Sequence, residues 1–361
     1  MNANRELHEL GQSLWIDNIT RTMLDEGTLA GYVEELAVTG LTSNPTIFDK
    51  AVGAGDTYDS SIAELADTGV EGEELFFKLA IDDLRRAADI FEPVHSRTDG
   101  VDGWVSLEVS PLLSDETDAT IAQVRKLHSE ADRPNIFIKI PGTPAGLGAI
   151  EAAIYSGIPV NVTLLFSAEQ YLAAADAYMR GVERRVAEGL NPAVASVASL
   201  FISRWDVALG DDAGESLRNR LGIAVAGRAY RAYRELLDSA RWQRLANEGA
   251  RPQRMLWAST GTKDPDAPDV LYVEALAAPF TINTMPENTL KAFADHGKAG
   301  EPMERDAATA EETLAEMAAA GVDVDELAAR LQREGAEAFV KSWSELLESI
   351  GTKSRRLAAA G

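Results

Sequence analysis

The chain has 361 residues, of which 45% are hydrophobic and 25% charged, as in an ordinary globular protein. It contains no cysteine, which excludes disulfides, thiolate catalysis and cysteine-based metal sites. Its formal net charge of −24 argues against nucleic acid as a partner, and any small phosphate must be held by a few local cations.

Short β-rich runs alternate with helical patterns along the whole chain. The helical patterns cover residues 28–38, 73–91, 115–130, 146–156, 168–188 and 217–246. The β-rich runs are residues 13–19, 40–44, 104–110, 136–141, 159–166, 196–202, 255–259 and 280–285. This alternation predicts a parallel sheet with crossover helices, and eight repeats favour an α/β fold of the closed (β/α)8 TIM barrel type. An open doubly wound sheet is the competing fold, but no G-x-G-x-x-G follows an early strand.

Two segments are longer than a simple barrel requires. Residues 45–103 are long for one crossover and predict extra helices between the second and third strands. Residues 306–350 predict further helix after the last strand, where Phe339, Trp343 and Leu346 recur at helical spacing and should pack on the barrel. Since no linker or low-complexity stretch is visible, we expect residues 1–361 to form a single domain.

The fourth strand carries the residue of greatest chemical interest, Lys139. Side chains alternate along a barrel strand, so Phe137 and Lys139 should face the interior while Ile138 and Ile140 face the helices. Burying an ammonium group is costly, and desolvation favours the neutral amine, which is a nucleophile. The alternative is a lysine at the strand end whose charged head reaches water.

Polar side chains occupy the same inward positions on neighbouring strands, near the end where barrel enzymes place their active sites. Any one of them alone could be a hydrated strand end, but six consecutive strands repeat the pattern, which indicates a small polar substrate. A lysine among carboxylates, amides and hydroxyls suits imine chemistry on a polyhydroxylated carbonyl compound. These positions are Asp17, Thr42, Asn44, Ser106, Glu108, Ser110, Asn161, Thr163, Ser199 and, just past its strand, Arg204.

Several of these segments resemble the transaldolase family, in its longer bacterial type. The resemblance implies a (β/α)8 barrel that transfers a dihydroxyacetone unit from sedoheptulose 7-phosphate to glyceraldehyde 3-phosphate, yielding erythrose 4-phosphate and fructose 6-phosphate in the pentose phosphate pathway. It implies no cofactor and no metal, because the lysine imine itself accepts the electrons. The similar segments are Leu-Trp-Ile-Asp at 14–17, Thr-Gly-Leu-Thr-Ser-Asn-Pro-Thr at 39–46, Ile-Phe-Ile-Lys-Ile-Pro at 136–141, Asn-Val-Thr-Leu-Leu-Phe-Ser at 161–167, Ser-Leu-Phe-Ile-Ser-Arg at 199–204 and Trp-Ala-Ser-Thr-Gly-Thr-Lys at 257–263.

The resemblance also implies roles for individual residues. Lys139 corresponds to the Schiff-base lysine, and Asp17 to the acid/base group that takes the proton of the C4 hydroxyl. Glu108 and Thr163 correspond to the pair that positions a water for proton transfer.

Substrate contacts follow from the same resemblance. Asn44 and Asn161 correspond to residues that hold the dihydroxyacetone hydroxyls. Ser199, Phe201 and Arg204 belong to the expected substrate-binding set, with Ser199 and Arg204 near the phosphate.

The chain departs from other branches of the family after the seventh strand, where they place an arginine. Here the nearest cation is Lys263, which cannot make a bidentate contact. We expect Lys263 to be a phosphate ligand; the alternative is an ordinary exposed loop lysine.

Two other functions remain open at this point: a Schiff-base aldolase that releases dihydroxyacetone to solvent, and a sugar-phosphate-binding barrel without catalysis. The expected partners are sugar phosphates, and the chain could be a monomer or a homodimer. No apolar run approaches the ~20 residues of a membrane helix and no secretory signal is visible, so we expect a cytoplasmic protein without membrane attachment.

Overall fold

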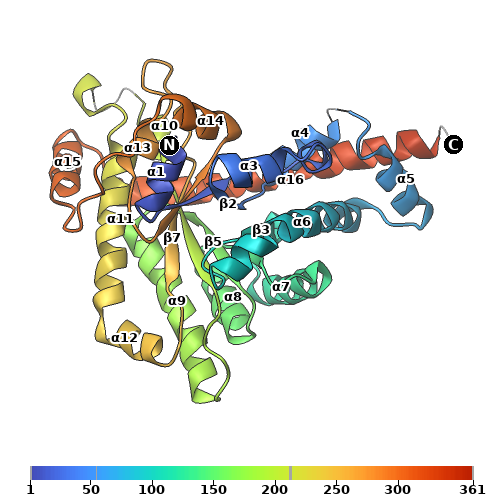
Figure 1. The fold of residues 1–361 in the computed structure, drawn as a ribbon, viewed down its shortest axis with the longest axis horizontal. Helices are drawn as coiled ribbons and strands as arrows, with labels where there is room; N and C mark the ends of the chain where they lie inside the picture. Colours follow the sequence, from blue (N-terminus) through green and yellow to red (C-terminus); the bar gives the residue numbers. More distant parts are fainter. Residues whose placement is uncertain (1, 54, 211–213, 360–361) are drawn as a thin grey trace.

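The fold is a closed barrel of parallel strands surrounded by helices (Figure 1). The computed structural model describes residues 2–53, 55–210 and 214–359. Each strand pairs with its neighbours in chain order, and β1 pairs with β8 to close the barrel. The strands are β1 (Ser13–Ile16), β2 (Val38–Leu41), β3 (Trp104–Glu108), β4 (Ile136–Pro141), β5 (Val160–Leu165), β6 (Ser196–Phe201), β7 (Gln253–Ala258) and β8 (Thr281–Met285). The predicted (β/α)8 TIM barrel is therefore confirmed.

Helices connect successive strands and add two further groups. Helices α4 to α6 lie between β2 and β3, and α15 and α16 follow the barrel, so the extra helices predicted at both places are present. The α-helices are α1 (Ala3–Glu9), α2 (Arg21–Asp25), α3 (Thr28–Glu35), α4 (Pro45–Gly53), α5 (Asp59–Asp67), α6 (Gly72–Arg97), α7 (Thr117–Ala131), α8 (Pro144–Tyr155), α9 (Ala168–Ala187), α10 (Ser203–Leu209), α11 (Leu221–Asp238), α12 (Ala240–Asn247), α13 (Leu271–Ala275), α14 (Glu287–His296), α15 (Ala308–Ala319) and α16 (Val324–Ala358), with 3-10 turns at Pro111–Leu113 and Glu215–Leu217.

Several boundaries differ from the predicted ones. The second strand runs from Val38 to Leu41, whereas residues 40–44 were predicted, and position 40 must be glycine because an added Cβ would fall 2.6 Å from the ring of Trp15. The helical pattern at 217–246 is divided at Ser239, which caps α12. The C-terminal helical segment is broken near Gly321, where φ is +90°, and α16 then continues past residue 350.

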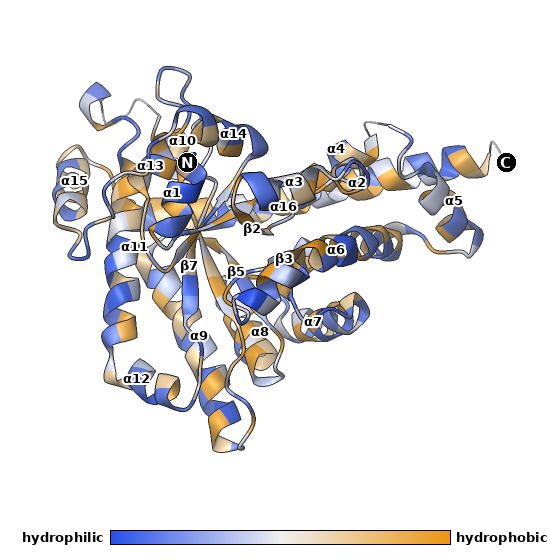
Figure 2. Ribbon diagram, in the orientation of Figure 1, coloured by the Kyte–Doolittle hydropathy of each residue, from blue (hydrophilic) through white to orange (hydrophobic). Residues whose placement is uncertain are grey.

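The barrel interior is filled at its N-terminal end by large apolar side chains. The rings of Trp104 and Phe137 stack with centroids 4.1 Å apart, and Trp15 lies against Phe137. Val197, Leu256 and Ile282 complete this layer. A second, larger core lies between the strands and the helices, and Figure 2 shows hydrophobic and hydrophilic stretches alternating along the long helices around the barrel. The polar inward residues are thus left at the C-terminal end.

The long helix α16 crosses the C-terminal side of the barrel and continues beyond it beside α4 and α5 (Figure 1). Gln332 fixes this crossing, because its side-chain amide donates to the carbonyls of Gly142 at 3.1 Å and Leu164 at 2.9 Å, at the ends of β4 and β5. Within the described part of the chain, no helix is both long enough and apolar enough to cross a membrane.

Candidate active site

A cavity of about 350 Å³ lies at the C-terminal ends of the strands, beneath α16. It brings together side chains from the ends of seven strands, all except β3, and from the C-terminal helix. Of the residues expected from the sequence, the cavity is lined by Asp17, Thr42, Asn44, Lys139, Thr163, Ser199, Phe201 and Arg204. This is the end of the barrel where enzymes of this fold place their active sites.

Lys139 lies in the barrel interior with only 6% of its surface exposed. Its Nζ donates to the carbonyl of Ser43 at 2.7 Å and to Oε2 of Glu108 at 3.1 Å. The pair with Glu108 follows from strand register, because the two residues are directly opposite on adjacent parallel strands and both face inward. The structure therefore confirms a buried, inward lysine and excludes the alternative of a lysine reaching bulk water.

The Ser43 carbonyl reaches Lys139 because of the local sequence. Pro45 begins α4, which suits the first helical position, and Asn44 Oδ1 accepts the backbone N–H of Ile47 at 3.1 Å as a helix cap. The hydroxyl of Ser43 donates to the Ser106 carbonyl at 2.8 Å. The Thr-Ser-Asn-Pro segment therefore turns the chain so that one backbone oxygen points at the amine.

Glu108 is almost completely buried, and its only side-chain hydrogen bond among the described residues is the one to Lys139. Burial raises the pKa of its carboxyl group, while the nearby Lys139 ammonium acts in the opposite direction. A carboxylate held in this way is prepared to accept a proton from the amine. Glu108 does not line the open cavity, and Lys139 stands between the two.

Asp17 follows β1 directly, and its backbone N–H donates to the Met285 carbonyl at 2.9 Å. Burial raises the pKa of its carboxyl group to about 6, and the charges of Lys263 and Lys139 partly oppose this effect. A carboxyl group that titrates close to neutral pH is suited to exchanging protons with a substrate.

Thr163, Asn161 and Ser199 lie at different depths. The Thr163 hydroxyl is buried at the cavity wall and has no hydrogen-bond partner among the described residues, so it is available to a water or a substrate. Asn161 is fully buried below the cavity and does not line it. Its amide donates to the Ser106 hydroxyl at 3.2 Å and accepts from the Ser199 hydroxyl at 2.7 Å.

Arg204 provides a cation at the cavity wall. It is half-buried, lies 5.4 Å from the ring centroid of Phe201, and makes no ion pair with a carboxylate in the described parts of the chain. Burial lowers the pKa of its guanidinium group. An unpaired, partly desolvated guanidinium in an acidic protein is suited to bind an anion.

Lys263 lies in the loop after β7 and is exposed, and it does not line the cavity. Its positive charge nevertheless lowers the pKa of Asp17, and this effect is larger than that of Lys139. Whether it contacts a phosphate stays a prediction.

Sequence reasoning missed several residues that line the cavity. Thr284 is one of them, and its hydroxyl lies 2.9 Å from that of Thr42. Ser259 is another; it lies in the left-handed region with φ +58°, and its hydroxyl is 2.9 Å from that of Ser203. Strand alternation in β8 could have identified Thr284. No local pattern could have placed Phe339 and Ser342 here, because they come from α16.

Comparison with known proteins extends this picture. The family model described as "Transaldolase/Fructose-6-phosphate aldolase" matches residues 14–350. A protein named transaldolase from Parafrankia sp. (strain EAN1pec) is 46% identical, and the match covers 96% of each chain. Proteins of the same name from Thermobifida fusca and Thiobacillus denitrificans are 46% and 45% identical, covering 96% and 97% of this chain and 96% and 100% of their own lengths.

Proposed function

This chain belongs to the transaldolase/fructose-6-phosphate aldolase family and acts as a transaldolase on sugar phosphates, and we propose that it transfers dihydroxyacetone through a Schiff base on Lys139. The observation that carries the proposal is the buried ion pair of Lys139 with Glu108 at the wall of a polar cavity. A sugar-binding barrel without catalysis has no need of a desolvated amine at this position.

Formation of the imine requires the amine to lose a proton. Glu108 accepts a proton from Lys139, and Nζ then attacks the C2 carbonyl of the ketose. The nitrogen passes one of its protons to the C2 oxygen, and the resulting hydroxyl takes up the proton held by Glu108 and leaves as water, which forms the iminium. The free hydroxyl of Thr163 is available to hold that water. Both residues therefore serve the same proton transfers.

Cleavage follows from the iminium. Asp17 takes the proton of the C4 hydroxyl, the C3–C4 bond breaks, and its electron pair moves into the C2–nitrogen system to form an enamine. The aldose phosphate leaves with its new aldehyde group. The enamine then attacks the aldehyde carbon of the acceptor, and Asp17 returns its proton to the new hydroxyl. The raised pKa of Asp17, about 6, suits both directions.

Arg204 is proposed to hold the substrate phosphate. We expect Arg204→Ala to raise KM for phosphorylated donors about ten- to over a hundredfold, because a charge-assisted contact contributes ~1.5–3 kcal/mol. KM for unphosphorylated dihydroxyacetone donors should change much less. The measurement compares both donor types in steady-state kinetics, with Arg133→Ala, a partly exposed arginine paired with Asp89, as the control. Equal losses for both donors would refute the phosphate assignment.

Glu108 is proposed to exchange protons with Lys139. We expect Glu108→Gln to slow both formation and hydrolysis of the imine by ~10²–10⁴-fold, the usual loss for a positioned acid or base, while the fold is retained. Rapid-quench trapping with borohydride measures the rate, and Glu151→Gln, whose carboxylate on α8 pairs with Arg180 of α9 away from the cavity, is the matched control. An unchanged rate of adduct formation in Glu108→Gln would show that this carboxylate is only structural.

A further inference from the structure

The roof of the active-site cavity is built by α16. Ala338, Phe339 and Ser342 line the cavity from this side, opposite the strand ends. The ring centroid of Phe339 lies 6.0 Å from Nζ of Lys139, on the open side of the amine. Phe339 is only half-buried, so part of its ring is available to whatever occupies the cavity.

Contacts on both sides of Phe339 hold this roof in place. On one side Gln332 bonds to the ends of β4 and β5, and the helix packs closely there, since a Cβ added to Gly335 would lie 3.0 Å from the Leu164 side chain. On the other side the Ser342 hydroxyl accepts a hydrogen bond from Thr46 at 3.0 Å, next to the Asn44 turn. The position of Phe339 over Lys139 is therefore fixed by hydrogen bonds and packing.

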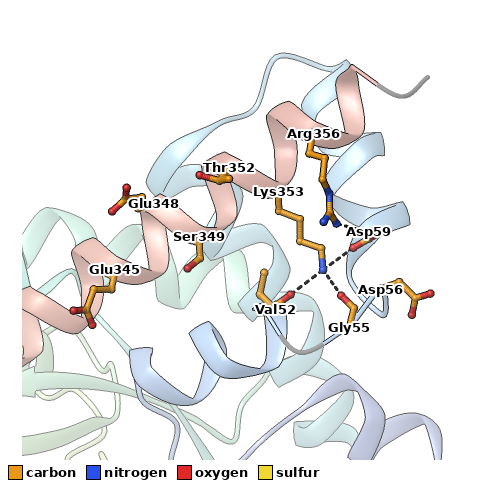
Figure 3. Close-up of a pocket in the computed structure, with 11 residues that line it drawn as sticks. Val52, Gly55, Asp56, Asp59, Glu345, Glu348, Ser349, Thr352, Lys353 and Arg356 are labelled. Carbon is orange, nitrogen blue, oxygen red and sulfur yellow. Dashed lines mark hydrogen bonds and ion pairs between the residues drawn. The ribbon is translucent and has the colours of Figure 1, made fainter.

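A further set of contacts holds α16 closer to its C-terminal end, where Lys353 points toward the connection between α4 and α5 (Figure 3). Its Nζ donates to the Val52 carbonyl at 2.8 Å and to the Gly55 carbonyl, and it pairs with Asp59 at 2.6 Å. All three N–H groups are thus directed at protein oxygens. Because α4 begins at Pro45, next to the Asn44 turn in the cavity wall, the contacts of Lys353 connect this wall to α16, which covers the cavity.

The enamine intermediate has two possible fates, and the roof bears on the choice between them. In transfer, its C3 carbon attacks the aldehyde of the acceptor. In release, C3 takes up a proton instead, a water adds to C2 of the iminium, the C2–nitrogen bond breaks, and free dihydroxyacetone leaves while the amine regains its proton. Transfer also ends with hydrolysis of an iminium, that of the new ketose, so both fates need water at C2. They differ at C3 of the enamine, where release requires a proton donor and transfer requires the acceptor aldehyde.

We propose that Phe339 is a specificity-determining residue that covers the enamine on Lys139, limits protonation of its C3 carbon by solvent and so favours transfer over release. This inference rests on the proposed Schiff-base function. The apolar ring lies 6.0 Å from Nζ on the α16 side of the cavity, where it takes space that solvent would otherwise fill. Excluding water from a site in this way limits side reactions of a reactive intermediate.

The test measures both fates together. With fructose 6-phosphate as donor and erythrose 4-phosphate as acceptor, transfer yields sedoheptulose 7-phosphate and release yields free dihydroxyacetone. We expect Phe339→Ala to raise the ratio of dihydroxyacetone to sedoheptulose 7-phosphate several-fold, because solvent can then protonate C3 of the enamine. Phe339→Leu, which keeps an apolar side chain of smaller size, should raise the ratio less.

Matched controls separate this effect from general damage to α16. Leu347→Ala removes another half-buried apolar side chain of the same helix that does not line the cavity, and its product ratio should equal that of the unmodified protein. An unchanged ratio in both Phe339 variants would overturn the inference, and so would an equal rise in Leu347→Ala. If the unmodified protein forms no borohydride-trapped adduct on Lys139, the proposed function fails instead, which is a distinct result.

Discussion

Replacing Lys139 with alanine is expected to abolish the borohydride-trapped adduct with any ketose donor and, with it, all measurable transfer. The imine can form only on a neutral amine that faces the cavity, and Lys139 is the lysine that lines it. Lys139→Arg should be equally inactive, because a guanidinium stays protonated and cannot attack a carbonyl. Mass spectrometry after borohydride treatment with fructose 6-phosphate measures the adduct.

Mapping the adduct to a residue provides the internal control. Lys353 is also buried, but its amine is bound by protein oxygens at a different surface of the molecule, so it should carry no adduct. The Schiff-base assignment would have to be abandoned if the adduct persisted in Lys139→Ala, or if it mapped to another lysine in the unmodified protein.

Asp17→Ala is expected to leave imine formation intact but to lower turnover by ~10²–10⁴-fold, the usual loss for one positioned acid or base. The proton of the C4 hydroxyl then has no acceptor, so the reaction stops before the C3–C4 bond breaks. The trapped species should therefore be the intact six-carbon adduct. A three-carbon adduct that accumulates at the normal rate would show that Asp17 does not serve cleavage.

The same residue predicts a pH dependence. Burial raises the pKa of Asp17 to about 6, so the carboxylate form that accepts the proton is present above this value and is lost as the pH falls through it. We expect kcat/KM of the unmodified protein to fall on the acidic side with an apparent pKa near 6. This limb should disappear in Asp17→Ala, and a limb that persists in the variant would assign it to another group.

The inward positions of the candidate site were predictable from local sequence. Side chains alternate along a strand, so the placement of Phe137 inside the barrel also placed Lys139 inside, and the same rule oriented Thr163 and Ser199. The eightfold repeat of strand and helix predicted the closed barrel, and the barrel predicted the end at which the site lies. Similarity to a known family then supplied roles that alternation cannot supply.

The contacts between these side chains, and their depth below the cavity, could not be predicted from local sequence. The sequence placed Asn161 and Glu108 on the correct face, but only the structure shows that Asn161 lies below the cavity and that Glu108 is paired with Lys139. Strand register decides which residues are opposite each other, and register results from the packing of the whole barrel. The need for glycine at position 40 is likewise a tertiary effect, because an added Cβ there would meet the ring of Trp15 from the neighbouring strand.

The sequence by itself determined the strand faces, the order of the elements and an inward lysine, because these follow from periodicities of two and 3.6 residues that are local properties of the chain. It also marked Phe339 as part of an apolar helix stripe that should pack on the barrel. Only the tertiary structure decided that this stripe lies over the amine of Lys139. The reason is that helical spacing specifies which face of α16 is buried, whereas the contacts of Gln332, Ser342 and Lys353 with distant segments specify what that face covers.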